Sequence, residues 1–286
     1  LKTLVKKELK ADAEEFGDNR RSPIVAREAA RAMEETDLIP SENITAVLSN
    51  QGWVRATKGH EINASELSYK SGDDYLHSVR GRSNQMLVPI DTTGRTYAIP
   101  GHKLPSARGQ GEPLTSLIDP PAGAGFAGLL MGQSTDKYLL CSSAGYGFVC
   151  SVADMLSKNR KGKATLKVPE GFSALVPSSV SEYQTDSVAV VTSAGYLAIY
   201  AASELPELGR GKGVKVINIP SKLLKSGDEY VVSAVAFSQG QTVVVHSGQR
   251  YLNLKPSEQD HYRGARGLRG KKLPRGFQQV RQLGVE

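Results

Sequence analysis

Residues 188–195 read VAVVTSAG, four apolar and mainly β-branched residues followed by a small polar turn that ends in glycine. This pattern favours a buried strand that enters a tight hairpin, because glycine accepts the positive φ that such a turn needs. Similar runs occur four more times, at residues 44–52 (ITAVLSNQG), 86–94 (MLVPIDTTG), 138–145 (YLLCSSAG) and 242–248 (TVVVHSG). The chain is therefore predicted to be built from five repeats.

The spacing of the repeats predicts their architecture. The turn glycines are 42, 51, 50 and 53 residues apart, at Gly52, Gly94, Gly145, Gly195 and Gly248. A period near 50 residues is typical of a four-stranded blade, because four strands of about 5–6 residues and their loops use that much chain. The sequence predicts an all-β, propeller-like disc of five blades over residues 43–286.

The N-terminal residues 1–42 follow a different pattern. Apolar residues recur at helical spacing from Leu1 to Phe16, and Gly17 supplies a stop. A second helix is predicted over residues 23–36, with Ser22 as its N-cap. We interpret residues 1–42 as a helical tether, and we expect the chain, which starts without Met, to be part of a longer polypeptide.

The amino-acid composition limits the cellular compartment in which we expect this protein. The chain has 286 residues, a net charge of +7 and only two cysteines. Two cysteines cannot form a disulfide framework, and no apolar stretch reaches the ~18 residues of a membrane span. We expect a cytoplasmic protein without a membrane span, in which Cys141 and Cys150 are buried free thiols; a functional disulfide is the alternative.

Basic side chains gather in glycine-containing loops. Residues 261–286 hold seven basic side chains and one acidic one. In four of the five repeats a basic, glycine-containing loop also follows the turn glycine, at residues 107–111, 159–163, 209–213 and 262–267. Repetition at one position of a disc predicts a curved positive rim that a bent duplex could follow. The alternative is that these are simply glycine-rich loops with exposed cations.

Several runs resemble one known family. They are GWVR at 52–55, KGH at 58–60, LPSARGQGEPL at 104–114, AGYGFVC at 144–150, KG at 212–213 and INIPS at 217–221. Together with the repeats, they resemble the C-terminal β-pinwheel domains of bacterial type IIA topoisomerases, and those of topoisomerase IV more than those of gyrase. The N-terminal runs ADA at 11–13 and DNRRSP at 18–23 resemble the end of the catalytic core of that family.

The resemblance implies a fold and a function. A β-pinwheel is a propeller-like disc whose blades exchange strands. The family relationship also implies sequence-independent binding and bending of double-stranded DNA, which presents a transport segment for ATP-dependent relaxation and decatenation during chromosome segregation at the nucleoid. Gyrase relatives carry a box of the form Gln-Arg-Arg-Gly-Gly-Lys-Gly after the first turn glycine. The corresponding residues 65–71 retain only Lys70, so we expect moderate bending instead of a full wrap.

The predicted DNA contacts are cations of the repeated loops and of the early blades that extend their path. Phosphate contacts of this kind fix affinity without reading sequence. The predicted residues are Arg55, Lys58, Lys70, Arg80, Arg82, Arg95, Arg108, Arg160, Lys161, Lys163, Arg210, Lys212, Arg263, Arg266, Arg269, Lys271 and Lys272.

We expect no catalytic, metal or cofactor site in this chain. Arg250-Tyr251 superficially resembles the cleavage pair of the family, but it follows the fifth turn glycine as Trp53 and Tyr196 follow theirs, which places it in a strand. No P-loop motif is present, and the five histidines lack metal-ligand spacing. ATP and Mg are therefore expected to act through other domains of the holoenzyme.

Partners follow from the resemblance as well. It implies a separate ATPase polypeptide (the B subunit), a second copy of the cleavage polypeptide (the A subunit) and, as a further partner, bacterial condensin. This chain alone is expected to be monomeric. The alternative interpretation is a propeller-like protein-docking domain without a DNA-guiding role. A propeller-type hydrolase is disfavoured because no loop gathers an acid, a base and a nucleophile.

Overall fold

The computed structural model describes residues 1–18 and 40–286. The chain forms two compact units, residues 1–38 and 39–286. In the first, helix α1 (Lys2–Phe16) ends where the Gly17 N–H donates to the Ala13 carbonyl at 3.1 Å. This confirms the first predicted helix, whereas the second, over residues 23–36, lies outside the described residues. None of the described helices is long and apolar enough to cross a membrane.

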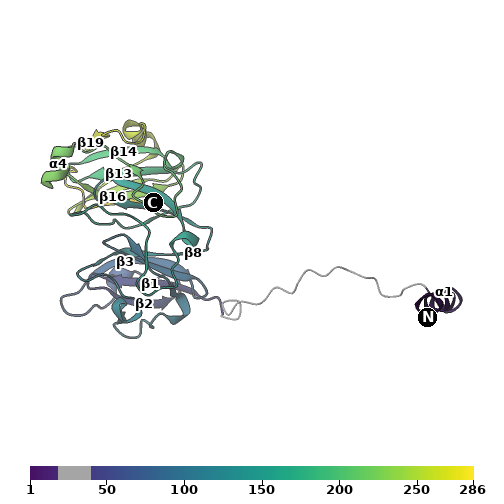
Figure 1. The fold of residues 1–286 in the computed structure, drawn as a ribbon. Helices are drawn as coiled ribbons and strands as arrows, with labels where there is room; N and C mark the ends of the chain where they lie inside the picture. Colours follow the sequence, from purple (N-terminus) through teal and green to yellow (C-terminus); the bar gives the residue numbers. More distant parts are fainter. Residues whose placement is uncertain (19–39) are drawn as a thin grey trace. The chain divides into compact units, whose positions relative to one another are not determined.

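The second unit contains five antiparallel sheets, each built on a hairpin that flanks a turn glycine (Figure 1). All five turn glycines have φ between 61° and 86°, which explains the residue type. The predicted five-bladed arrangement is confirmed. The hairpins are β1 (Asn43–Ser49) with β2 (Trp53–Lys58), β4 (Met86–Asp91) with β5 (Arg95–Thr96), β9 (Lys137–Ser142) with β10 (Tyr146–Ser151), β13 (Ser187–Thr192) with β14 (Tyr196–Ala201), and β17 (Val243–Ser247) with β18 (Arg250–Leu254).

In several hairpins, a polar side chain at the start of the turn accepts a hydrogen bond from the backbone of the strand that follows. The side chains of Ser49 and Asp91 each accept the N–H of the residue four positions later, at 3.0 Å. Buried Asp91 also accepts the Tyr97 hydroxyl at 2.7 Å. The small polar residues of the repeat therefore satisfy backbone donors at the turn.

A third strand pairs with the first strand of each hairpin. It follows the hairpin in the same repeat and runs antiparallel to it. These strands are β3 (Tyr75–Arg82), β8 (Phe126–Gly132), β12 (Ser178–Val180), β16 (Val231–Phe237) and β20 (Gln282–Val285). The short strand β6 (Ile99–Pro100) also pairs with β4.

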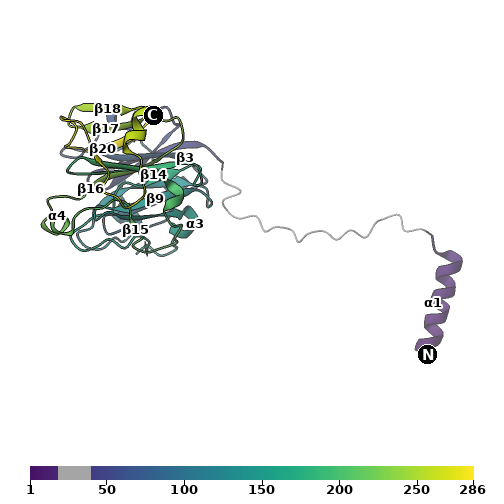
Figure 2. The same ribbon diagram turned by 90° about the horizontal axis from the view of Figure 1, so that it is seen from above.

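The fourth strand of a blade comes from the following repeat. Each of these two-residue strands lies after the next hairpin in sequence and pairs with the second strand of the preceding hairpin. They are β7 (Glu112–Pro113) beside β2, β11 (Lys163–Ala164) beside β5, β15 (Val214–Lys215) beside β10 and β19 (Lys271–Lys272) beside β14. Blades one to four are thus completed by strand exchange. In the described residues the fifth sheet contains only β18, β17 and β20 (Figure 2).

Apolar cores lie between successive blades. Leu48 of blade one packs in one cluster with Leu129 of blade two, and Val191 of blade four packs with Val245 of blade five. Two further clusters join blades two to three and three to four. Within residues 40–286 no such cluster joins blade five to blade one, so four apolar joints hold five blades together.

Both cysteines lie inside the domain. Cys141 and Cys150 are buried and free, as predicted, and burial raises the pKa of each to about 12.

Short helices connect the strands. They are η2 (Ala64–Glu66), η3 (Gly101–Lys103), α2 (Leu114–Leu117), α3 (Val152–Met155), η4 (Ala202–Glu204), α4 (Ser221–Ser226), α5 (Pro256–Gln259) and η5 (Asp260–Tyr262).

Candidate nucleic-acid interface

The four basic loops lie directly before, or run into, the exchanged strands. Each reaches its strand through a glycine with positive φ. A Cβ there would lie less than 3.0 Å from a carbonyl oxygen of the neighbouring hairpin, so no other residue fits without movement. These glycines are Gly111, Gly162, Gly213 and Gly270. They are therefore required by strand exchange, and only the cations around them remain as evidence for a binding surface.

We call each basic loop, together with its glycine and the exchanged strand that follows, an exchange loop. Each exchange loop also presents a cation that has no side-chain partner in the described part of the chain. Arg108 and Arg210 lie three residues before the exchange glycine, and Lys161 and Lys271 lie next to it. All four are exposed, and none of them has a side-chain hydrogen bond, ion pair or ring contact within the described residues. The fold thus presents one uncommitted positive charge at each of its four exchange points, which suits phosphate contacts.

Besides Arg55, which lies 4.9 Å from the ring centroid of Tyr69, four predicted cations lie over or near an aromatic ring that follows a turn glycine. Lys70 is 3.1 Å from the ring centroid of Trp53, and Lys212 is 3.7 Å from that of Tyr146. The Tyr196 ring carries Arg269 at 4.0 Å and Lys272 at 5.6 Å. For these four cations the ring belongs to the residue directly after the turn glycine, and the repeated aromatic at that position was the signal that could have predicted these contacts.

The fold itself uses some of the predicted cations. Arg55 is 5% exposed and donates to the carbonyls of Ser68 at 2.7 Å and Gly109 at 3.2 Å. Arg95 donates to two carbonyls of the next exchange loop, and Lys163 donates to the Asp154 carbonyl. Arg55 therefore lies inside the fold instead of on a surface, which contradicts its prediction as a DNA contact.

Other predicted cations have acidic or carbonyl partners. Lys58 pairs with Glu42 at 3.0 Å, Arg160 lies 3.7 Å from Asp119, and Arg263 lies 3.3 Å from Asp260. Arg266 donates to the carbonyls of Glu204 and Lys215 at 2.9 and 2.8 Å. Exposed pairs of this kind contribute little to stability, so these side chains can exchange partners at low cost.

Arg269 is held more firmly. Its guanidinium is 2.7 Å from the buried Glu229 carboxylate, whose other oxygen has no partner in the described part of the chain. Burial acts to lower the pKa of Arg269, but the hydrogen bonds and charge interactions with Glu229 and Tyr196 together outweigh it, and the pKa is raised. By contrast Arg80 and Arg82, both on β3, are exposed and have no side-chain partner among residues 40–286.

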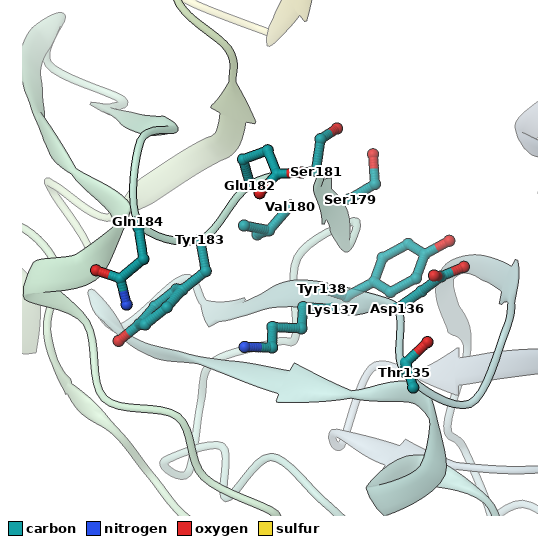
Figure 3. Close-up of a pocket in the computed structure, with 10 residues that line it drawn as sticks. All are labelled: Thr135, Asp136, Lys137, Tyr138, Ser179, Val180, Ser181, Glu182, Tyr183 and Gln184. Atoms are coloured by element: carbon teal, nitrogen blue, oxygen red, sulfur yellow. The ribbon is translucent and has the colours of Figure 1, made fainter.

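A pocket beside β9 and β12 is a poor site for phosphate (Figure 3). Its charged lining residues are Asp136, Lys137 and Glu182. The Lys137 ammonium is already paired with Glu207 at 2.8 Å. The two remaining carboxylates would repel a polyanion.

Known proteins share this fold and this sequence pattern. A family model described as the DNA gyrase C-terminal domain, a β-propeller, matches residues 136–176 and 186–238, which form most of blades three and four. The solved C-terminal domain of Escherichia coli ParC matches with a TM-score of 0.73 and 42% identity, covering 86% of this chain and 99% of that one. This chain belongs to the family of C-terminal domains of the topoisomerase IV A subunit.

Curated topoisomerase IV relatives extend the match to the whole chain. The A subunit of DNA topoisomerase 4 from Pseudomonas aeruginosa is 49% identical over all 286 residues, and that from E. coli K12 is 44% identical. This chain spans 38% of the length of each. The solved gyrase A C-terminal domain shares only 15% identity at a TM-score of 0.65, which shows a common fold.

Proposed function

We propose that this topoisomerase IV domain binds double-stranded DNA along its exchange loops, without reading sequence, and bends it moderately. The observation that carries the proposal is the repeated free cation at the four exchange points, Arg108, Lys161, Arg210 and Lys271. A protein-docking disc would not require a cation at each of these points. Arg80 and Arg82 are further candidate contacts, on β3 at the opposite edge of the blade-one sheet from the exchanged strand β7.

The role within a holoenzyme is part of the proposal. The domain presents a transport segment for ATP-dependent relaxation and decatenation during chromosome segregation, in the cytoplasm at the nucleoid. DNA cleavage, ATP hydrolysis and Mg belong to other domains, with ATP hydrolysis in the B subunit. A second A subunit completes the enzyme, bacterial condensin is a further partner, and residues 1–286 alone are monomeric.

The free cations set the expected salt dependence. Neutralising about six phosphates gives a slope of log K against log salt of about −5. Such a slope costs roughly 10³-fold in affinity between 50 and 200 mM salt. The cations stacked on Trp53, Tyr146 and Tyr196 are held near the same loops and would steepen the slope if they also meet phosphates.

The test is a binding titration across a salt series. The chain is titrated with a linear duplex of about 40 base pairs, and end-to-end fluorescence transfer reports the bend in the same experiment. The test variant combines Arg108→Ala, Lys161→Ala and Arg210→Ala. The matched control combines Lys222→Ala, Lys225→Ala and Lys255→Ala, which removes the same charge from exposed residues outside the exchange loops.

We expect the test variant to flatten the salt slope by about 3 and the control to leave it nearly unchanged. Base preference should be absent in both proteins, because phosphate contacts carry no sequence information. Weak, salt-insensitive binding by the unmodified chain would contradict the proposal and favour the protein-docking alternative. Equal losses in the two variants would mean that net charge, and not the loops, drives binding.

A further inference from the structure

The first four blades define the contacts that a fourth strand makes. It pairs with the first two residues of the second hairpin strand, as Lys271 and Lys272 pair with Leu197 and Tyr196. Shortly after the pairing, a buried aliphatic residue donates its N–H to the carbonyl of the turn glycine at 2.8 to 3.0 Å. These residues are Leu114, Leu166, Val216 and Leu273.

The donated segments share a short pattern. Three of them read glycine, two variable residues and then the buried aliphatic residue: residues 111–114, 213–216 and 270–273. The segment at residues 162–166 has one residue more. Since the glycine has positive φ and lies against a hairpin carbonyl, a side chain there would prevent the strand from seating.

Blade five has the same hairpin but an open edge. Its second strand begins with Arg250 and Tyr251, the positions that Tyr196 and Leu197 occupy in blade four. Within residues 40–286 no strand other than β17 pairs with β18. Both residues are exposed, and Tyr251 is 66% exposed. An unpaired edge with these backbone groups in water is a ready template for another strand.

The outward face of blade five is only partly covered: Val244 is buried there, but its neighbours toward the turn and on β18 are not. His246 and Asn253 are exposed there, whereas the matching face of blade four is buried against blade five. The outer face of blade one, at the other end of the series of blades, is covered by a loop of its own repeat. Arg55 on that face donates to the Ser68 carbonyl in the loop. Among the five blades, as residues 40–286 form them, the open edge is thus particular to blade five.

We propose that the β18 edge is a strand-binding site for another protein, which contributes an extended acidic segment of the pattern Gly-x-x-Leu/Val. A second copy of this chain is a poor donor, because its four segments of this kind already complete its own blades. Acidic character is favoured because the edge begins with the exposed Arg250, which together with Arg281 lines a groove at the turn end of the hairpin. This inference is independent of DNA binding.

The test uses a synthetic peptide with the sequence of residues 107–118, the donor segment of blade one, which carries an acidic residue after its glycine. The peptide is added to the intact chain, and hydrogen exchange of each backbone amide is followed by NMR. We expect saturable protection of the amides of residues 250–252. A peptide with Gly111 replaced by Val should bind roughly tenfold more weakly, because the left-handed backbone excludes a side chain.

Two further measurements keep the proposal falsifiable. A peptide with Glu112 replaced by Lys tests the charge preference and should also bind more weakly. The same segment joined to Glu286 through a flexible linker removes the cost of association and should protect residues 250–252 even where the free peptide binds poorly. Protection of residues 53–54 alone, equal binding of the glycine and valine peptides, or no protection in the linked form would overturn the proposal.

Discussion

In blade four the first two residues of β14 pair with β19, whereas the equivalent residues of blade five, Arg250 and Tyr251, have no exchanged strand beside them within the described residues. The hairpins are otherwise alike: each has buried valines before its turn and a turn glycine with positive φ. What differs is the chain that follows. Blade four receives both an exchanged strand and an apolar neighbour from the next repeat.

The difference shows that a blade is not a complete unit of this fold. A hairpin such as β13–β14 buries one face against the preceding blade and needs its successor to cover the other. This is the energetic logic of repeat proteins, in which each unit contributes part of its neighbour's core. Substitutions at equivalent positions of blades four and five should therefore have very different costs.

The largest effect is expected at the glycine that admits the exchanged strand. Gly270→Ala places a Cβ against the Leu197 carbonyl, and we expect it to lower the free energy of unfolding by about 4 kcal/mol. Gly248→Ala, in the turn of blade five, shares the positive φ but has nothing within 4 Å, so it should cost only about 1 kcal/mol. Urea unfolding measures both, and equal losses would show that backbone strain alone sets the cost.

The next largest loss of stability is expected from truncating a side chain on the face of the blade-four hairpin that blade five covers. Leu197 is fully buried, and Leu197→Ala should destabilise the domain by about 3 kcal/mol through lost burial and a cavity. Tyr251 holds the equivalent place in blade five, and Tyr251→Ala should change stability by less than about 0.5 kcal/mol because the side chain is in water. Thermal unfolding of the two variants tests this. A large loss from Tyr251→Ala would mean that blade five is covered in solution.

A smaller, pH-dependent effect is expected where blade one meets blade two. His77 Nδ1 accepts the Leu129 N–H at 3.1 Å, and burial lowers the pKa of His77 to about 4 from an ordinary 6.5. Between these values the unfolded chain binds a proton that the folded chain does not, so stability rises with pH across this window and falls as the pH drops from 6.5 to 4. We expect a loss of about 2 kcal/mol over that drop.

Variants separate this contribution from other titrations. His77→Gln should flatten the stability profile between pH 4 and 6.5, the window set by the His77 pKa. His246→Gln, on the exposed outer face of blade five, should leave the profile as it was. Chemical unfolding at a series of pH values measures both. An unchanged slope in His77→Gln would assign the pH dependence to other groups.

Much of the fold is predictable because its signals are local. The turn glycines and the apolar runs before them fix the hairpins, and their period fixes the number of blades. Strand exchange followed only from the family resemblance, because a two-residue strand such as β7 has no periodicity to detect and pairs with a hairpin far away in sequence. The glycines that permit the exchange are visible in the sequence, but nothing local distinguishes them from flexible parts of basic loops.

The candidate site is predictable as a set of loops and less so residue by residue. A sequence shows that Arg55 and Arg108 are both cations, but only the structure shows one buried against backbone carbonyls and the other in water. Alternation along β2 places Arg55 on the face that a loop of its own repeat covers. The stacking of Lys212 on Tyr146 joins residues far apart in sequence, so the repeated aromatic after the turn glycine marks the ring, but only the structure identifies the cation that lies over it.

The smallest effect tests that stacking. Lys212→Gln removes the ammonium 3.7 Å from the Tyr146 ring centroid and should lower the free energy of unfolding by about 0.5 kcal/mol, the value typical of an exposed cation–π contact. Lys225→Gln removes another exposed charge, with no ring beside it among the described residues, and should have no measurable effect. In blade five the second hairpin strand begins with Arg250 instead of an aromatic residue, so within the described residues no stacked cation holds a strand there. If the two variants behave alike in urea unfolding, the ring does not hold the exchange loop, and Tyr146 becomes a free surface beside the proposed DNA path.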